Sequence, residues 1–224
     1  SHHFRSSSSA VEQFEILHTA SPTSHPTITG AAAAGTVGAT INTSDGRSLA
    51  IATNVAVTGS VTATAGFNTI TLGTEQASTS GTSIDFTGIP AGVKHISIMP
   101  VGGATNGTTN WLVQLGDAGG FETTGYTSRT GNTGGAGAAT STAGFVIQGA
   151  VLAADGHHGT ITLDLEDSAG FTWVCSSTLI ADNTTVIISA GSKSLSAVLT
   201  QLRLTTANGT DAFDAGVINI SYQS

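Results

Sequence analysis

The feature that most constrains the fold of this chain is the uneven distribution of its aromatic residues. Between Glu15 and Asp85 the sequence holds one aromatic side chain, Phe67, whereas every Trp and Tyr lies beyond Phe86. Ordering one residue costs roughly 1–2 kcal/mol of backbone entropy, and a fully buried Val or Leu returns only about 1.5–3 kcal/mol. A segment of Thr, Ala, Ser and Gly with single Val or Ile residues therefore cannot fold alone. Because it is nearly uncharged and rich in β-branched residues, we expect it to order by winding together with copies of itself.

Charge and hydropathy exclude several classes of partner. The net charge is −8, and the six Lys and Arg residues are scattered singly along the chain. Binding of nucleic acid or of anionic lipid needs clustered cations, so neither is expected. The chain has no apolar run near the roughly 20 residues that cross a bilayer, and Ser1–Ala10 lacks the apolar core of a secretory signal. A neutral or amphoteric partner such as a glycan fits this composition better.

The order of turn and strand signals divides the chain into three parts. Residues 1–26 are interpreted as a linker, whose first nine residues resemble a tag remnant, with one short amphipathic helical turn at Ala10–His18. Residues 27–75 hold short strand-like pieces separated by turn signals such as Asp45-Gly46 and are predicted to form a thin, β-rich stem. The polar segment Glu75–Gly81 marks the boundary to a head at residues 82–224.

The head carries conventional strand signals. Thr is the commonest residue type in the chain, and β-branched side chains suit a pleated surface. Several short strands joined by Gly, Asn and Asp turns predict an antiparallel β-sandwich. The stretch Thr130–Thr142 is predicted to be a long loop. The predicted strands are Val93–Met99, Trp111–Leu115, Gly144–Gln148, Thr160–Asp164, Phe171–Cys175, Thr184–Ser189, Val198–Leu204 and Gly216–Tyr222.

The head also resembles the carboxy-terminal domain of tail fibres and tailspikes of tailed bacteriophages. The matching pieces are Ser83–Pro90 (SIDFTGIP), Thr105–Gly107, Leu115–Asp117, Glu122–Tyr126 (ETTGY) and Thr140–Phe145. The resemblance implies a homotrimer that is a virion component, acts outside the cell and recognises a bacterial surface glycan or outer-membrane receptor. The overall expectation is an all-β protein with an intertwined trimeric stem and a sandwich head. None of the matching motifs is a catalytic signature.

Two alternatives to receptor binding follow from the same sequence. A fragment of a capsule or lipopolysaccharide depolymerase would need two carboxyls about 5–9.5 Å apart beside a sugar cleft, and the candidate pairs are Asp164 with Glu166 and Asp117 with Glu122. A purely structural trimerisation module would show no cell binding. We expect no enzyme activity, because no Gly-x-Ser-x-Gly elbow joins a strand to a helix and the two carboxyl pairs are explained by a solvated strand face and a turn contact. We expect no cofactor, and the Gly-rich stretch Thr130–Thr142 lacks the Lys and the strand–helix context of a phosphate cradle.

Five residues are candidates for receptor contact. Aromatic faces and planar polar groups on exposed loops suit glycans, which selects Trp111, Tyr126 and Arg129, although Trp111 begins an apolar run, for which core packing is the stronger interpretation. His157 and His158 are predicted to form a polar hairpin tip, from which both rings project if they lie in a turn. Three chains around an axis could gather metal ligands that one chain lacks, which leaves metal binding open. Cys175 is expected to be buried and inert.

Overall fold

The computed structural model describes residues 69–134, 137–149, 152–153, 155–181 and 185–224. The chain divides into two units, Ser1–Thr62 and Ala63–Ser224, and all of the described residues belong to the second. The predicted linker at 1–26 and residues 27–68 of the predicted stem lie outside the described residues. The fold below is that of the second unit.

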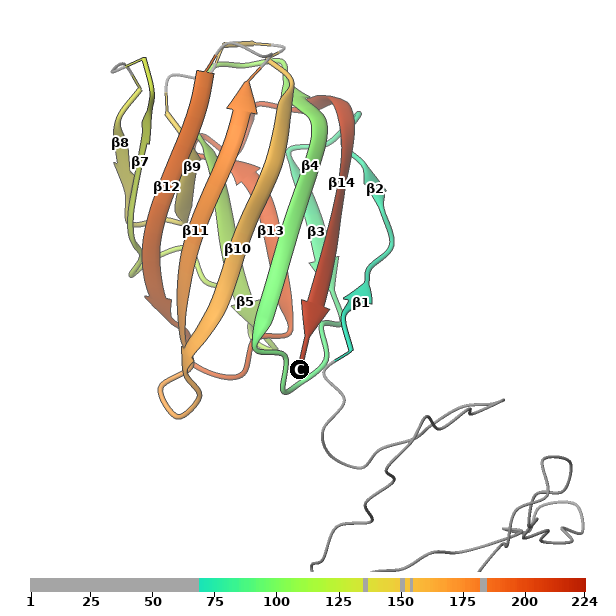
Figure 1. Ribbon diagram of the computed structural model, residues 1–224, viewed down its shortest axis with the longest axis vertical. Coiled ribbons are helices and arrows are strands. Elements are labelled where there is room, and N and C mark those ends of the chain that lie inside the picture. The colour runs from blue at the N-terminus through green and yellow to red at the C-terminus, as the bar shows by residue number, and fades with distance from the viewer. Residues whose placement is uncertain (1–68, 135–136, 150–151, 154, 182–184) are drawn as a thin grey trace, which may run out of the picture. The chain divides into compact units, whose positions relative to one another are not determined.

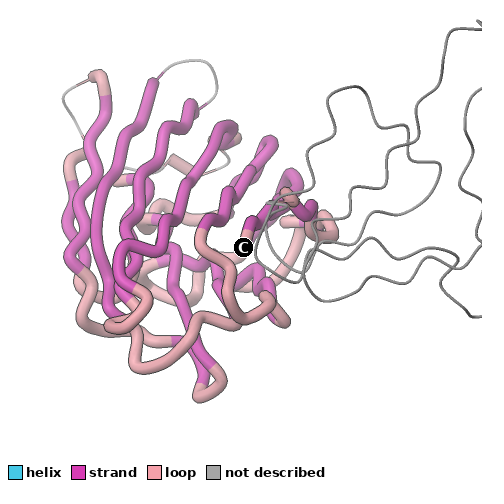
Figure 2. Tube along the Cα trace, turned by 60° about the horizontal axis from the view of Figure 1, so that its bottom comes forward, coloured by secondary structure: helices cyan, strands magenta, loops and turns pink. Residues whose placement is uncertain are grey.

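All regular structure in the described part of the chain is β-strand, as predicted for an all-β protein (Figures 1 and 2). The longer strands alternate buried and exposed side chains, which gives each sheet one face toward the core. The strands are β1 (Thr71–Leu72), β2 (Gln76–Ala77), β3 (Ser83–Thr87), β4 (His95–Thr105), β5 (Trp111–Asp117), β6 (Gly120–Phe121), β7 (Thr127–Asn132), β8 (Ala139–Ser141), β9 (Phe145–Gln148), β10 (His157–Asp167), β11 (Thr172–Ala181), β12 (Thr185–Ser194), β13 (Gln201–Thr206) and β14 (Phe213–Gln223).

The described strands form two antiparallel sheets. Nine of them make the larger sheet, in the order β1-β14-β4-β10-β11-β12-β7-β8, with β2 also paired to β14. Five make the smaller sheet, in the order β3-β13-β5-β6, with β9 also paired to β5. Figure 1 shows β3, β5 and β13 behind β10, β4 and β14. One hydrophobic cluster contains buried residues from both sheets, so the sheets share a core.

The aromatic residues of this unit explain why it folds as one chain. Trp111 and Phe213 pack edge to face with ring centroids 5.1 Å apart, and Tyr126 and Phe145 do the same at 5.0 Å. Each such ring buries a large apolar area and adds a directional contact. Cys175 is buried in the same cluster, as expected, and burial raises the pKa of its thiol to about 12.

The larger sheet begins earlier in the chain than the predicted boundary. Thr71 and Leu72 pair with the end of β14, and Gln76 and Ala77 pair further along the same strand. Both segments lie ahead of residue 82, where the sequence placed the start of the head. The pairing was missed because these short pieces carry almost no apolar side chains and are held mainly through their backbones.

Strands β7 and β8 correct a second expectation. The predicted loop at Thr130–Thr142 contains the end of β7 and all of β8, which pair with each other next to β12. Their sequences are Thr, Ser, Gly, Ala and Asn with a single Arg, so they give no hydrophobic alternation to read. β7 is defined by its pairing to β12, whose strand signal is clear, and β8 by its pairing to β7.

Local turn chemistry agrees with the sequence. The Gly119 amide donates to Asp117 Oδ1 at 2.7 Å, so the Asp117 side chain caps the turn between β5 and β6. Gly88 and Gly92 have φ of 73° and 91°, the left-handed region that favours glycine. The loop that contains Asn106 is bonded to the loop before β14, because the Ala212 amide donates to Asn106 Oδ1 at 2.9 Å.

Candidate functional site

The outward face of the smaller sheet carries an ion pair between its first two strands. Asp85 on β3 and Arg203 on β13 are direct cross-strand partners. The Arg203 Nε–H donates to Asp85 Oδ1 at 2.8 Å, and Nη2–H donates to Oδ2 at 2.7 Å. This two-point arrangement fixes the plane of the guanidinium. Arg203 Cζ also lies 4.0 Å from the ring centroid of Phe121, so an aromatic ring covers one face of the cation.

The pair is ionised at neutral pH and carries no net charge. Hydrogen bonding and attraction from Arg203 lower the pKa of Asp85 despite the opposing effect of partial burial. The same bond raises the pKa of Arg203. Both side chains are about one-third exposed, 34% for Asp85 and 31% for Arg203. Solvent screening therefore keeps the pair's contribution to stability small, and its geometry matters more than its energy.

Asp85 uses only part of the hydrogen-bonding capacity of Arg203. A guanidinium has five N–H donors, and Asp85 accepts from two of them. Among the described residues, no other protein atom accepts a hydrogen bond from Arg203. The site therefore holds a rigidly placed set of donors beside open space.

A polar groove of about 470 Å³ lies on one side of this pair. Gln114 on β5 is the cross-strand neighbour of Arg203, and Thr205 is the neighbour of both Ser83 and Leu112, so the groove crosses three strands. Its floor is ordered by hydrogen bonds: Gln114 Nε2 donates to the Ala143 carbonyl at 2.9 Å, and Thr205 Oγ1 donates to the Thr82 carbonyl at 2.9 Å. The remaining lining comes from Thr123, from Thr206 at the end of β13, and from Ala207, Asn208 and Gly209 after it.

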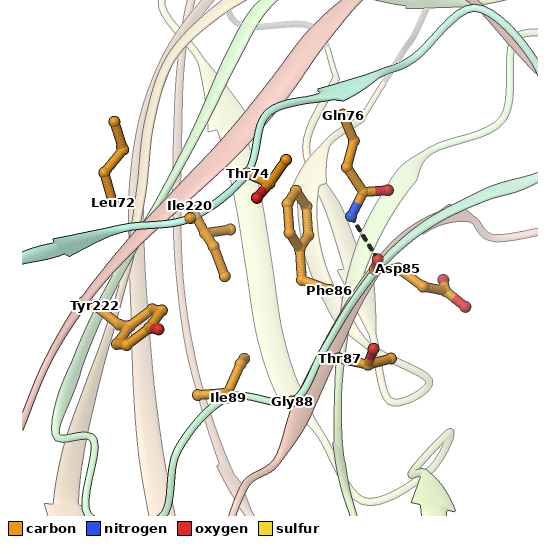
Figure 3. A pocket seen from close by; sticks show the side chains of 11 residues that line it. Leu72, Thr74, Gln76, Asp85, Phe86, Thr87, Gly88, Ile89, Ile220 and Tyr222 are labelled. Carbon is orange, nitrogen blue, oxygen red and sulfur yellow. Dashed lines mark hydrogen bonds between the residues drawn. The ribbon is translucent and has the colours of Figure 1, made fainter.

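A second pocket, of about 340 Å³, lies on the other side of β3 and opens between the edges of the two sheets (Figure 3). Phe86 and Ile89 from one side and Ile220 from β14 give it an apolar floor. Gln76 closes one end, and its Nε2 donates to the Asp85 carbonyl at 2.7 Å. Tyr222 and Leu72 lie at the opposite end in Figure 3. The strand that carries Asp85 therefore separates a polar groove from a mixed pocket.

Three of the five residues predicted to contact a receptor are buried. Trp111, Tyr126 and His157 expose 0%, 2% and 0% of their surface. For Trp111 the structure supports the core-packing alternative, because its ring packs against His157 with centroids 4.5 Å apart and edge to face against Phe213. A side chain enclosed in this way cannot reach a ligand on the surface, so these three receptor-contact predictions are wrong for the described fold.

Tyr126 has a structural role instead. The Leu115 amide donates to its hydroxyl oxygen at 2.7 Å, and the hydroxyl donates to the Glu122 carbonyl at 3.0 Å. Burial raises the pKa of the phenol well above its ordinary value. The motif Glu122–Tyr126 thus folds the chain back onto β5, and its tyrosine is the inner anchor of that turn.

The two histidines are not a hairpin tip. His157 and His158 are the first residues of β10, where successive side chains point to opposite faces. His157 points inward, with Nδ1 3.0 Å from the Gly103 carbonyl oxygen. His158 is exposed, and its Nδ1 accepts from the Gly102 amide at 3.3 Å. No group of three or more His, Cys, Asp or Glu side chains suited to a metal occurs in the described part of the chain.

Arg129 is exposed, as the sequence predicted. It lies on β7 of the larger sheet, whereas Arg203 and Asp85 lie on the smaller sheet. The structure therefore does not bring the predicted residues together into one site. It brings together Asp85, Arg203, Phe121 and Gln114, of which only Asp85 belongs to a motif that the sequence singled out. Opposite charges on two outward strand positions were the available signal, but 118 residues separate the pair.

The carboxyl pairs considered for sugar cleavage serve as hydrogen-bond acceptors. Ser196 bonds to both members of the pair Asp117 and Glu122. Its Oγ donates to Asp117 Oδ2 and its amide donates to Glu122 Oε1, each at 2.6 Å. The bond from Ser196 is the main cause of the lowered pKa of Asp117. Burial opposes ionisation of Glu122, but bonds from Lys193 and Ser196 outweigh it and lower the pKa. A general acid needs a raised pKa, which neither carboxyl has.

The pair Asp164 and Glu166 lies on the open face of the larger sheet. Asp164 contacts His95, with Oδ1 2.7 Å from the imidazole Nδ1, and both side chains are about half exposed. Glu166 is exposed on the same strand. Neither carboxyl lines the groove or the pocket beside β3.

In the described segments, no helix has the length and apolarity needed to span a bilayer.

Comparison with known proteins gave no match to a family model, to a curated protein or to a solved structure.

Proposed function

We propose that this chain is part of a phage tail fibre or tailspike that attaches the virion to a glycan on the host bacterial surface. In this proposal residues 27–70 hold three chains together, and the two sheets of each chain form a sandwich head. The polar groove beside Asp85 and Arg203 is the glycan site. The protein acts by binding, as a virion component outside the cell.

The observation that carries the proposal is the fixed guanidinium at the edge of the groove. Asp85 and Phe121 immobilise Arg203 while leaving N–H donors unused by the protein. Sugar hydroxyls accept such hydrogen bonds, and a donor that is already ordered loses little entropy on binding. Asp85 cancels the charge of Arg203, so the site suits a neutral polyol better than an anion.

The rest of the groove has the same chemical character. Besides Arg203, the groove is lined by the hydroxyl of Ser83 and by Gln114 and Thr205, whose side-chain oxygens can still accept hydrogen bonds. Its volume of about 470 Å³ lies within the range of small-molecule sites. Open, polar sites of this kind bind weakly one at a time. Three heads on one stem would raise the overall avidity well above the affinity of a single site.

A glycan array probed with the full chain tests the proposal. We expect the wild type to bind a subset of bacterial surface glycans, and Arg203→Ala to weaken that binding about tenfold or more, since hydrogen bonds to a charged group are among the stronger ones. Arg203→Lys keeps the charge but loses the planar, two-point geometry, so it should also bind weakly.

Asp164→Asn is the matched control, because it removes an exposed carboxylate from the open face of the other sheet. It should bind as the wild type does. Thermal unfolding of each variant separates loss of binding from loss of fold. Normal binding by a folded Arg203→Ala variant would contradict the assignment of the groove. If the wild type binds no bacterial glycan, the receptor-binding proposal fails, and the alternative of a purely structural trimerisation module is left.

A further inference from the structure

We infer that a shallow depression around Arg129, on the outer face of the larger sheet, binds a sugar residue that carries a carboxylate, so that the head recognises acidic polysaccharides. This inference rests on the proposed function and specifies its ligand class. The depression lies on the other sheet from the groove beside Arg203 and would be a second contact point for an extended chain.

The depression is formed by small side chains between larger ones. It has a volume of about 390 Å³ and spans β7 and β12. Gly131 is the cross-strand partner of Ile188, and Ala190 is the partner of Arg129. A Cβ atom built at Gly131 would meet nothing within 4 Å, so the space above this position is open. Ala138, ahead of β8, completes the outer rim.

Arg129 carries an uncompensated charge at this place. Its cross-strand neighbours are Ala190 on one side and Thr140 on the other, and both are uncharged. In the part of the chain that the structure describes, no carboxylate pairs with Arg129. This contrasts with Arg203, whose charge is cancelled by Asp85. The free guanidinium is therefore complementary to an anion, and its planar fork matches a carboxylate in two-point geometry.

The apolar part of the depression explains why the anion would be carried by a sugar ring. Ile188 is 59% exposed and lines the depression beside Gly131 and Ala190. A pyranose ring has an apolar C–H face and polar edges. With that face against Ile188 and Ala190, a carboxylate on the ring's edge can lie at Arg129. A free inorganic anion would use the charge but not this surface.

The net charge of −8 opposes the binding of acidic polysaccharides at long range. A protein of this charge repels polyanions at long range. An acidic polysaccharide that remains bound must therefore make favourable short-range contacts. Arg129 is suited to supply them, because it is exposed and free of partners among the described residues.

The test uses the full chain on uronic-acid-containing bacterial polysaccharides, each printed beside its carboxyl-reduced form. We expect wild-type protein to bind at least one carboxylated form about tenfold more tightly than the matching reduced form. Arg129→Gln should abolish this preference. Lys94→Gln is the control, since it removes another exposed cation of the described head, and it should keep the preference. A parallel arm uses phosphate-bearing glycans and their dephosphorylated forms.

The outcomes separate this inference from the proposed function. Equal affinity of wild type and Arg129→Gln for the carboxylated forms would overturn the inference, as would a preference that follows phosphate only. If neutral glycans still bind and still depend on Arg203, the proposed function stands without the acidic site. If neither neutral nor acidic glycans bind, the proposed function itself fails.

Discussion

At the scale of single residues, the hydroxyl of Tyr126 connects the turn after β6 to β5. Replacing Tyr126 with Phe removes the acceptor of the buried Leu115 amide. An amide left without a partner in the core costs about 1–3 kcal/mol, so we expect the free energy of unfolding to fall by that amount in urea titrations.

The matched control for this change is Tyr222→Phe. Tyr222 is only half-buried, and its hydroxyl makes no hydrogen bond within the described residues. Its free energy of unfolding should stay within about 0.5 kcal/mol of the wild type. Equal effects of the two substitutions would contradict the anchoring role of the Tyr126 hydroxyl.

Through Glu122, the stability of the fold depends on pH. Its carboxylate pairs with Lys193, whose side chain is only 7% exposed. Because the pKa of Glu122 is lower in the folded state than in the unfolded chain, its stabilising contribution is complete above the unfolded pKa. That contribution is lost as the pH falls below about 5 and through the folded pKa.

Glu122→Gln isolates this contribution. At pH 7 it should lower the free energy of unfolding by about 3 kcal/mol, because it leaves a buried cation unpaired. Toward pH 3 the difference from the wild type should shrink, since protonated Glu122 is then also uncharged. Denaturant titrations at several pH values measure both effects. A difference that does not change with pH would show that the ion pair is not its cause.

At the scale of elements, the edge strand formed by β1 and β2 depends on Gly73 between them. The Gly73 amide donates to the Ile220 carbonyl at 2.7 Å. A Cβ atom at this position would lie 2.9 Å from Ile220 Cγ1 and 3.1 Å from its carbonyl oxygen. Gly73→Val should therefore detach β1 from β14 and destabilise the fold by about 1–3 kcal/mol.

Hydrogen exchange would locate this effect. We expect faster exchange of the Leu72 amide and of the amides in the facing part of β14 in the variant, with the central strands β10 and β11 unchanged. Gly131→Ala serves as the control, because its added Cβ meets only open space. Unaltered exchange in Gly73→Val would show that β1 does not need close approach at this position.

The same scale shows how far the sequence predicts the fold. Alternation of apolar and polar residues identified β4, β10, β11 and β14, in which buried side chains alternate with less buried ones over at least part of each strand. No such pattern marks β2, β7 and β8, and the short strand signal at Thr69–Leu72, which contains β1, was assigned to the stem. These strands lie at or near the edges of the larger sheet, where backbone pairing holds segments that contribute little to the core.

The site was harder to predict than the strands for a related reason. Aromatic residues were chosen as glycan contacts, but the packing of two sheets places most of them in the core, where their area stabilises most. Phe121 is an exception, being half-buried under the guanidinium of Arg203. Arg203 reaches Asp85 only because β13 pairs with β3 in the folded protein. Arg129 was identified because an Arg in a polar stretch has little reason to be buried.

At the scale of the whole molecule, the paucity of aromatic residues before Asp85 predicts association. We expect the full chain to have a mass by light scattering of about three times 22.2 kDa. If the stem is ordered by burial between chains, as this prediction requires, dilution that dissociates the assembly should also reduce the β-sheet circular dichroism of the chain. A stable monomer with an ordered stem would contradict this expectation.

The most direct test of the account is binding of the fluorescently labelled full chain to a panel of bacterial strains, each compared with mutants that lack defined surface glycans. The account predicts saturable binding to at least one strain. That binding should disappear in one glycan-deficient mutant and should weaken with Arg203→Ala. Binding that persists unchanged in every glycan-deficient mutant, or no binding to any strain, would contradict it.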